Sequence, residues 1–294
     1  MNASRVHAVI AAGLENPALL SRWRREPESL RGCGIDPGEL DLEALWKFAG
    51  LTAKVRHNGL RAELPLTFRL LNVAELEIEV FASYASFRAT EGGRYANTVE
   101  SRTQDLLAFL ERWLDFDKRE HALVWDMIRY ELALTRLSKL AVDIPASLTD
   151  GTRSEAVARA ASVPSLRGEV ILHEMRSDPR IVRAMLQEKS PRLDEVPLGK
   201  YYFSYWRASA AAEMHILQLD ELGFYLLSLI DGKRSAADLS RMTGGSRRPP
   251  KSFLKALDQL AGIGIVSFDG RQESENRSQK TEDRSQESNA HSDF

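Results

Sequence analysis

The residues of this chain that could carry chemistry are few and lie far apart in the sequence. Asp117 and His121 are four residues apart, a spacing that would place both side chains on one helix face and that suits a metal ion. Glu169 and His173 have the same spacing, and on a strand they would share a face. Exposed pairs of opposite charge show the same pattern, so we interpret both pairs as structural rather than as metal ligands.

The other signals of catalysis are weak. Cys33 is the single cysteine, which excludes an internal disulfide and any zinc site built from several cysteines. Arg31 would favour its thiolate slightly, but a lone cysteine in a glycine-rich turn is usually inert. The sequence contains no nucleophile elbow, P-loop or zinc-protease motif, and Gly262-Ile263-Gly264 lacks the third glycine of a dinucleotide-binding loop. The sequence therefore predicts no catalytic centre, no metal site and no cofactor in this chain.

One short loop concentrates positive charge, with Arg247, Arg248 and Lys251 lying at the start of a predicted helix. In a helix-turn-helix protein this helix would be the recognition helix, so contacts with phosphate are one interpretation. The helix itself has no arginine, and Asp258 would repel phosphate. A solvated basic loop is the alternative.

Composition limits the class of protein. The chain has 294 residues, enough for two domains, and its formal net charge of −2 gives no strong field toward nucleic acid or an anionic membrane. No apolar run is long enough to cross a bilayer, and the N-terminus does not have the pattern of a signal peptide. The single cysteine suits a reducing compartment. We therefore expect a cytoplasmic protein.

The last 24 residues, 271–294, differ from the rest of the chain. Ala290 and Phe294 are their only apolar residues, so the segment cannot bury enough surface to offset the entropy of ordering it. We expect a disordered tail. It carries the whole net charge of −2, which leaves residues 1–270 neutral.

Apolar spacings of three and four predict an all-helical N-terminal domain over residues 1–145. Asp41 is a plausible N-cap for one of its helices. In another, Leu76, Ile78 and Val80 alternate with glutamates, which would also suit a strand, although its neighbours favour a helix. The predicted helices are Asp41–Leu60, Leu70–Phe87, Asn97–Leu114 and Lys118–Leu140.

Residues 146–165 contain proline, glycine, serine and threonine and are predicted to be a linker. Beyond them, residues 166–270 alternate between strand-like and helix-like patterns. Strands are predicted at Glu169–Met175, Lys200–Trp206, Glu213–Leu219 and Ile263–Phe268, and helices at Asp178–Lys189, Asp220–Ile230, Ser235–Met242 and Pro249–Ala261, the last closed by Gly262. From Lys200 onward this is the order of a winged helix. The predicted fold class is α+β, with a helical domain followed by a winged-helix domain.

Leu219 to Gly244, LDELGFYLLSLIDGKRSAADLSRMTG, resembles the PqqD-like fold known as the recognition element of ribosomally made, post-translationally modified peptides (RiPPs). The family pattern of a helix that ends in Asp-Gly-x-x-Ser/Thr is matched at Asp231, Gly232 and Ser235. Members bind the leader part of a precursor peptide as an added strand. The resemblance implies that Glu213–Leu219 receives the leader and that the helix Pro249–Ala261 packs against it.

The same resemblance implies a set of peptide-binding residues. Apolar leader residues would fill pockets between the strand and the helix, and the basic loop would meet acidic leader residues. The residues implied are Met214, His215, Ile216, Arg247, Arg248, Lys251, Phe253, Leu254 and Leu257.

The N-terminal half carries a second resemblance. The strings NPALLSRWRREPESL, from Asn16, and DLEALWKFAGLTAKVRHNGLR, from Asp41, are similar to partner subunits of DUF692 multinuclear non-heme iron oxidases in methanobactin and 3-thiaglutamate biosynthesis. The second system is the closer match. The likeness implies a heterodimer in which residues 1–145 dock on the oxidase, the oxidase holds the iron, and this chain presents the peptide.

These features favour a non-catalytic accessory subunit of a peptide-modifying oxidase. A winged-helix DNA-binding transcriptional regulator is the alternative. Because residues 1–270 carry no net charge, nucleic acid is the less favoured partner, and no membrane partner is expected.

Overall fold

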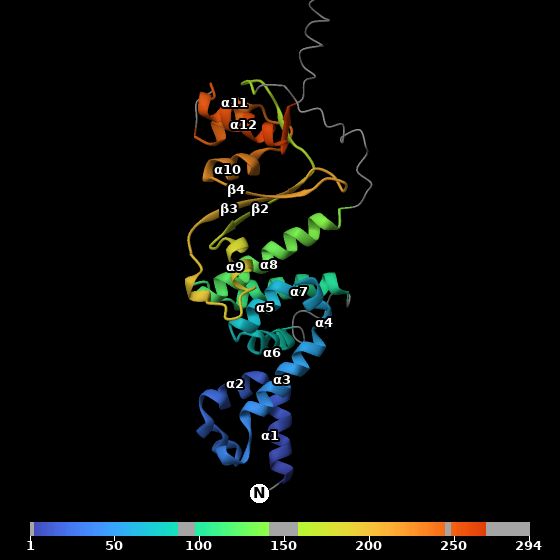
Figure 1. Cartoon of the computed structure of the whole chain (residues 1–294), viewed down its shortest axis with the longest axis vertical. Helices are drawn as coiled ribbons and strands as arrows, with labels where there is room; N and C mark the ends of the chain where they lie inside the picture. The colour runs from blue at the N-terminus through green and yellow to red at the C-terminus, as the bar shows by residue number, and fades with distance from the viewer. Residues whose placement is uncertain (1–2, 88–97, 141–157, 245–247, 269–294) are drawn as a thin grey trace, which may run out of the picture. The chain divides into compact units, whose positions relative to one another are not determined.

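A computed structural model describes residues 3–87, 98–140, 158–244 and 248–268 (Figure 1). The chain divides into two compact units, one of Met1–Thr135 with Met175–Lys200 and one of Arg136–Glu174 with Tyr201–Phe294. The first unit is helical and the second combines helices with small antiparallel sheets, so the chain is an α+β protein.

In the first unit, α1 to α3 pack around one apolar cluster. Leu20 and Leu30 are fully buried in it, and Trp23 packs directly on Gly13, where a Cβ would lie 2.8 Å from the indole ring. A side chain at position 13 would therefore displace the tryptophan.

The described helices of this unit, with α8 continuing into the second unit, are α1 (Ala3–Glu15), α2 (Pro17–Arg25), α3 (Leu42–Arg56), α4 (Asn58–Glu63), α5 (Pro65–Val73), α6 (Glu77–Phe87), α7 (Val99–Trp113), α8 (Arg119–Ser138) and α9 (Pro179–Met185).

Two predicted helices are each broken in the structure. The helix predicted over Asp41–Leu60 divides at His57, whose buried ring stacks on Phe81 at 4.4 Å between ring centroids. The segment predicted as one helix over Leu70–Phe87 divides at Glu75, which has a φ of 57°. A non-glycine residue in this left-handed region ends a helix. Of the alternating glutamates that suggested a strand, Glu75 lies at this break, and Glu77 and Glu79 lie on α6.

Helix starts follow the predicted capping chemistry. Asp41 accepts a hydrogen bond from the backbone N–H of Ala44 at 2.9 Å, as an N-cap does. Thr98, Asp178 and Asp220 cap α7, α9 and α10 in the same way. The ends were less well predicted, because Gly264 (φ 93°), and not Gly262, closes the last helix.

Two buried carboxylates on α8 hold other segments of the first unit. Glu131 accepts hydrogen bonds from the backbone N–H groups of Leu66 and Thr67, at the start of α5, and from the Thr67 hydroxyl. Asp126 accepts from the N–H groups of Arg176 and Ser177 and from the Ser177 hydroxyl. Burial raises the pKa of both carboxyls, although these hydrogen bonds oppose the shift.

The bonds to Asp126 explain why the two units do not follow the predicted domain boundaries. Residues 166–270 were predicted as one domain, but Met175–Lys200 belongs to the first unit. Within this segment, Val196 also accepts a hydrogen bond through its carbonyl from Arg119 at the start of α8. Conversely, Arg136–Ser138, the end of α8, belongs to the second unit. Residues 146–157 of the predicted linker and the predicted tail, 271–294, lie outside the described residues.

The described residues of the second unit form two small antiparallel sheets and the helices α10, α11 and α12, besides the end of α8. A three-stranded sheet has the order β2-β3-β4, and β1 pairs with β5 in a separate two-stranded ladder. From β3 onward the elements follow one another as two strands, three helices and a strand, but the last strand pairs with β1, a strand that the sequence did not reveal. The elements are β1 (Pro164–Leu166), β2 (Glu169–Met175), β3 (Tyr201–Arg207), β4 (Met214–Leu219), α10 (Glu221–Leu229), α11 (Ala236–Met242), α12 (Lys251–Ile263) and β5 (Val266–Phe268).

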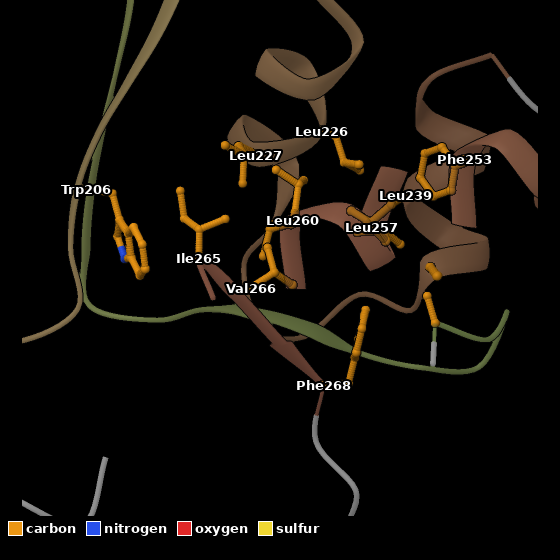
Figure 2. Packing of buried hydrophobic residues seen from close by; sticks show 13 residues of the cluster. Trp206, Leu226, Leu227, Leu239, Phe253, Leu257, Leu260, Ile265, Val266 and Phe268 are labelled. Atoms are coloured by element: carbon orange, nitrogen blue, oxygen red, sulfur yellow. The ribbon is translucent and has the colours of Figure 1, made fainter. Parts of the chain in front are cut away.

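An apolar core joins the helices and strands of this unit (Figure 2). Each helix contributes fully buried side chains, such as Leu226, Leu239 and Leu257. Trp206 of β3 lies next to Ile265, and its indole N–H donates to the carbonyl of Arg167 at 2.6 Å. The core therefore fixes β3, and with it the neighbouring strand β4, against the helices.

Candidate functional site

The strand β4 lies at one end of the three-stranded sheet. It pairs with β3 in a regular antiparallel register from Tyr202 opposite Leu219 to Arg207 opposite Met214. Among the described residues, no strand pairs with the other side of β4. In an antiparallel strand every second residue directs its N–H and C=O away from the neighbouring strand, so this side offers backbone donors and acceptors to another chain.

Side chains of β4 alternate between the two faces of the sheet. Leu217 and Leu219 pack on the core of the unit. His215 lies on this same face, and its exposed ring stacks on Trp206 with 5.0 Å between the ring centroids. Met214 and Ile216 lie on the opposite face, with Met214 41% exposed. The edge therefore presents apolar and aromatic side chains on both faces.

The helix α10 packs on β3 and β4 (Figure 1). It begins directly after β4, where the Asp220 carboxylate accepts the N–H of Gly223 at 2.7 Å. Tyr202 of β3 stacks on Phe224 at 4.8 Å between centroids and donates its hydroxyl to Glu221. These contacts hold the first turn of α10 on the sheet.

Two large apolar side chains of α10, Leu222 and Tyr225, point away from the core and are 42% and 49% exposed. Sequence reasoning did not identify them. A signal was available, because they lie three residues apart, whereas Leu226, Leu227 and Ile230 form the buried face of the same helix.

The predicted peptide-binding residues on α12 do not all reach the surface. Phe253 and Leu257 are buried in the core, at 4% and 0% exposure. Their apolar spacing marked the core face of the helix. Leu254 is partly buried against this core. The resemblance also placed the leader between β4 and α12, whereas in the structure α10 packs on β4 and α12 packs on β5.

The predicted basic loop is described in part. Arg247 lies outside the described residues, and Arg248 and Lys251 are exposed at the start of α12. Asp258, which seemed to argue against phosphate binding, accepts the backbone N–H of Ala158 at 2.6 Å. Its carboxylate therefore has a structural role.

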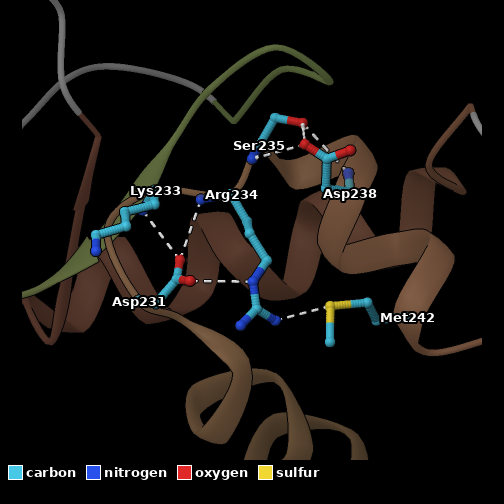
Figure 3. Close-up of polar contacts among 6 residues, drawn as sticks. All are labelled: Asp231, Lys233, Arg234, Ser235, Asp238 and Met242. Carbon is cyan, nitrogen blue, oxygen red and sulfur yellow. Dashed lines mark hydrogen bonds and ion pairs between the residues drawn. The ribbon is translucent and has the colours of Figure 1, made fainter.

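The Asp-Gly-x-x-Ser motif builds a turn and a helix start (Figure 3). The Asp231 carboxylate accepts from the N–H groups of Lys233 and Arg234, and these bonds lower the pKa of Asp231. Gly232 has a φ of 72°, which favours glycine. Ser235 and Asp238 form a reciprocal capping box at the start of α11, and the hydrogen bond from Ser235 lowers the pKa of Asp238. These groups position α10 and α11 by bonding one another.

The pairs considered as metal ligands have other partners. Asp117 lies in the turn before α8, not on the helix, and His121 accepts the N–H of Asp115 through Nδ1. Burial and the nearby Lys118 lower the pKa of His121. Glu169 pairs with Arg136 at 2.6 Å, and His173 packs edge-on against Tyr205. Cys33 is exposed.

The described part of the chain shows neither a metal cluster nor a membrane-spanning helix. It contains no group of three or more histidine, cysteine, aspartate or glutamate side chains arranged to hold a metal ion. None of its helices combines the length and apolar composition needed to cross a membrane.

Comparison with known proteins adds no relative. No protein-family model matches this sequence, and no curated protein is similar to it.

Proposed function

We propose that this chain binds an extended peptide along the outer side of β4. The observation that supports this proposal is that β4 ends the order of the sheet, with Met214 and His215 exposed along it. A peptide that adds a strand at such an edge satisfies backbone groups whatever its sequence, and its alternate side chains then supply specificity.

Backbone pairing alone is too weak for a useful complex. Each hydrogen bond contributes about 1 kcal/mol net, so four or five bonds fall short of the roughly 8 kcal/mol of a micromolar complex. Apolar peptide residues must supply the rest. Met214 on the strand and Leu222 and Tyr225 on α10 offer exposed apolar surface. Arg248 and Lys251 offer positive charge for acidic peptide residues.

The biological role that we propose is that of an accessory subunit. The peptide would be the leader of a ribosomally made precursor, presented to a multinuclear non-heme iron oxidase that carries out the modification in natural-product biosynthesis. The likeness of Leu219–Gly244 to the recognition element supports this role, as does a three-stranded sheet followed by α10, α11 and α12. The helical first unit would dock on the oxidase.

Proline substitutions at two neighbouring positions of β4 test the proposal. Backbone N–H groups of neighbouring residues point to opposite sides of a strand, so one of His215 and Ile216 directs its N–H outward and the other toward β3. Proline removes this donor. One of H215P and I216P should therefore remain folded by circular dichroism and lose peptide binding, and the other should lose stability.

Calorimetry with synthetic copies of short peptides encoded beside this gene gives the affinities. Loss of binding in the folded proline variant supports the proposal. If a folded H215P and a folded I216P both bind as tightly as the parent, the peptide lies elsewhere. Salt-dependent binding of duplex DNA without peptide binding would favour the regulator instead.

A further inference from the structure

A histidine ring holds the turn of residues 114–118, which joins α7 to α8. His121, in the first turn of α8, accepts the backbone N–H of Asp115 through Nδ1 at 2.9 Å. Its ring is 7% exposed and stacks on Trp113, the last residue of α7, with 5.2 Å between the ring centroids. The imidazole therefore connects the end of α7, the 114–118 turn and the start of α8.

This hydrogen bond requires a neutral ring. A neutral imidazole has one nitrogen with a free lone pair and one with a hydrogen, so Nδ1 accepts only while the hydrogen is on Nε2. An imidazolium has a hydrogen on both nitrogens and accepts no hydrogen bond. Protonation of His121 would set two donors against each other, Nδ1–H and the N–H of Asp115, and one of them must move.

The surroundings favour movement of the turn rather than of the ring. The indole of Trp113 covers one face of the ring, and a cation is attracted to an aromatic face. Asp115 and Lys118 are exposed, and the turn is closed by a hydrogen bond of 3.0 Å from the Lys118 N–H to the Asp115 carbonyl. A rotation of Asp115 would replace its N–H with its carboxylate as the group that faces Nδ1–H.

Charged groups from several segments act on the ring. Burial lowers the pKa of His121, and the charge of Lys118 lowers it further. The carboxylates of Asp115 in the turn, Glu120 of α8 and Glu79 of α6 oppose this shift. The ring is therefore neutral at neutral pH, and the same carboxylates would stabilise the imidazolium once it forms.

A hollow of about 460 Å³ adjoins the ring. Its lining includes His121 and Trp113, the four charged groups just described, and Arg25 of α2. Water in this hollow has access to the imidazole, so a proton can reach the ring while the rest of the unit stays folded.

We propose that His121 is a pH-sensitive switch, whose neutral ring holds the 114–118 turn closed and whose protonated ring releases it. Opening would also affect a second segment. Phe116 of the turn accepts a hydrogen bond through its carbonyl from the side chain of Arg176, whose backbone N–H is held by Asp126. Release of the turn therefore loosens the attachment of Met175–Lys200 to α8. This switch does not depend on peptide binding at β4.

NMR titration of the full chain tests the state of the ring. At about pH 7.5 the imidazole nitrogen shifts of His121 should show the tautomer with its hydrogen on Nε2. The pKa of the ring should lie below its ordinary value of 6.5, and the backbone amide of Asp115 should shift with the same midpoint. Comparison with the spectrum of H121N identifies the His121 signals.

Amide hydrogen exchange measures the opening of the turn. Protection is expressed relative to the unfolded chain, which removes the direct effect of pH on the exchange reaction. Each unit by which the closed turn lowers the ring's pKa makes opening about tenfold more favourable once the pH is below both pKa values. Protection of a peptide that covers residues 114–118 should therefore fall at least about threefold between about pH 7.5 and about pH 5.

Two variants separate the switch from other titrating groups. Asparagine at position 121 places an amide oxygen near Nδ1 and does not titrate, so H121N should keep the turn protected at both pH values. H7N removes an exposed histidine of α1 and should behave as the parent does.

Any of three results would overturn the proposal. The first is a His121 ring with its hydrogen on Nδ1 at neutral pH, or with a pKa of 6.5 or above. The second is equal protection of residues 114–118 at both pH values in the parent. The third is the same loss of protection in H121N as in the parent, because another group would then open the turn.

Discussion

At the scale of the residue, the polar side chains that stand out in this chain form hydrogen bonds that hold turns and helix starts. Asp231 and Ser235 match the family pattern in the sequence, and in the structure they form hydrogen bonds within one turn and one helix start. Glu131 has no distinguishing pattern in the sequence, yet its carboxylate caps the start of α5 from another helix. A helix N-terminus whose own cap residue, Leu64, has no side-chain oxygen needs an acceptor from elsewhere.

The buried carboxyl of Glu131 predicts a particular dependence of stability on pH. Burial raises its pKa, so the folded chain binds this proton more readily than the unfolded chain. The stabilisation is fully present below the unfolded pKa, about 4, and is lost as the pH rises through the folded pKa. Relative to E131Q, which does not titrate, the parent should lose free energy of unfolding as the pH rises from about 4 to 7.

Urea denaturation of both proteins over this pH range measures the difference. Asp126 is present in both proteins, so its contribution cancels in the difference between their free energies of unfolding. A parent that gains stability relative to E131Q with rising pH would contradict the prediction. T67V removes one of the donors to the carboxylate, which should raise the pKa of Glu131 further and steepen the trend.

At the scale of the element, neighbouring residues of α12 separate core from surface. Phe253 is buried, whereas Leu254 is only partly covered. Truncation of a buried phenylalanine leaves a cavity, so F253A should reduce the free energy of unfolding by about 3–5 kcal/mol. L254A is the matched neighbour and should cost less. Chemical denaturation compares the two variants, and equal losses would contradict the prediction.

The same pair shows what sequence patterns can predict about a site. Apolar spacing predicted α12 and its apolar face, but the same pattern results from core packing and from a binding groove. The burial of each side chain distinguishes core packing from a binding groove. This burial depends on elements distant in sequence, such as β5 and α11. Recognising β4 as an edge strand also required the order of the strands in the sheet, because no local sequence pattern shows which strand is last.

Element type was more predictable than element boundaries. β2 has the predicted bounds, Glu169–Met175, and Asp41 is an N-cap, as predicted. The breaks at His57 and Glu75 were not foreseen, because they depend on tertiary contacts and on a left-handed backbone conformation at a residue other than glycine. The pairing of β5 with β1 joins segments about 100 residues apart, beyond the reach of periodicity.

At the scale of the whole molecule, the first unit needs a segment that follows part of the second. Arg176 and Ser177 supply the donors to Asp126, and Val182 and Leu186 are fully buried. A fragment of residues 1–140 would lose these hydrogen bonds and the apolar burial of Val182 and Leu186. It should melt at a lower temperature than a fragment of residues 1–200, or without a sharp transition.

Circular dichroism of the two fragments during heating checks this expectation. Equal melting temperatures and equally sharp transitions would show that Met175–Lys200 is dispensable for the first unit.

The path of the chain between the units has a consequence for inheritance. The chain passes from one unit to the other after Thr135, after Glu174 and after Lys200. A single recombination point therefore cannot exchange one unit intact for that of another gene, and a single proteolytic cut cannot release one from the other. A lineage that acquires this protein acquires both units together, so a change in either unit must arise by substitution within that unit rather than by module exchange.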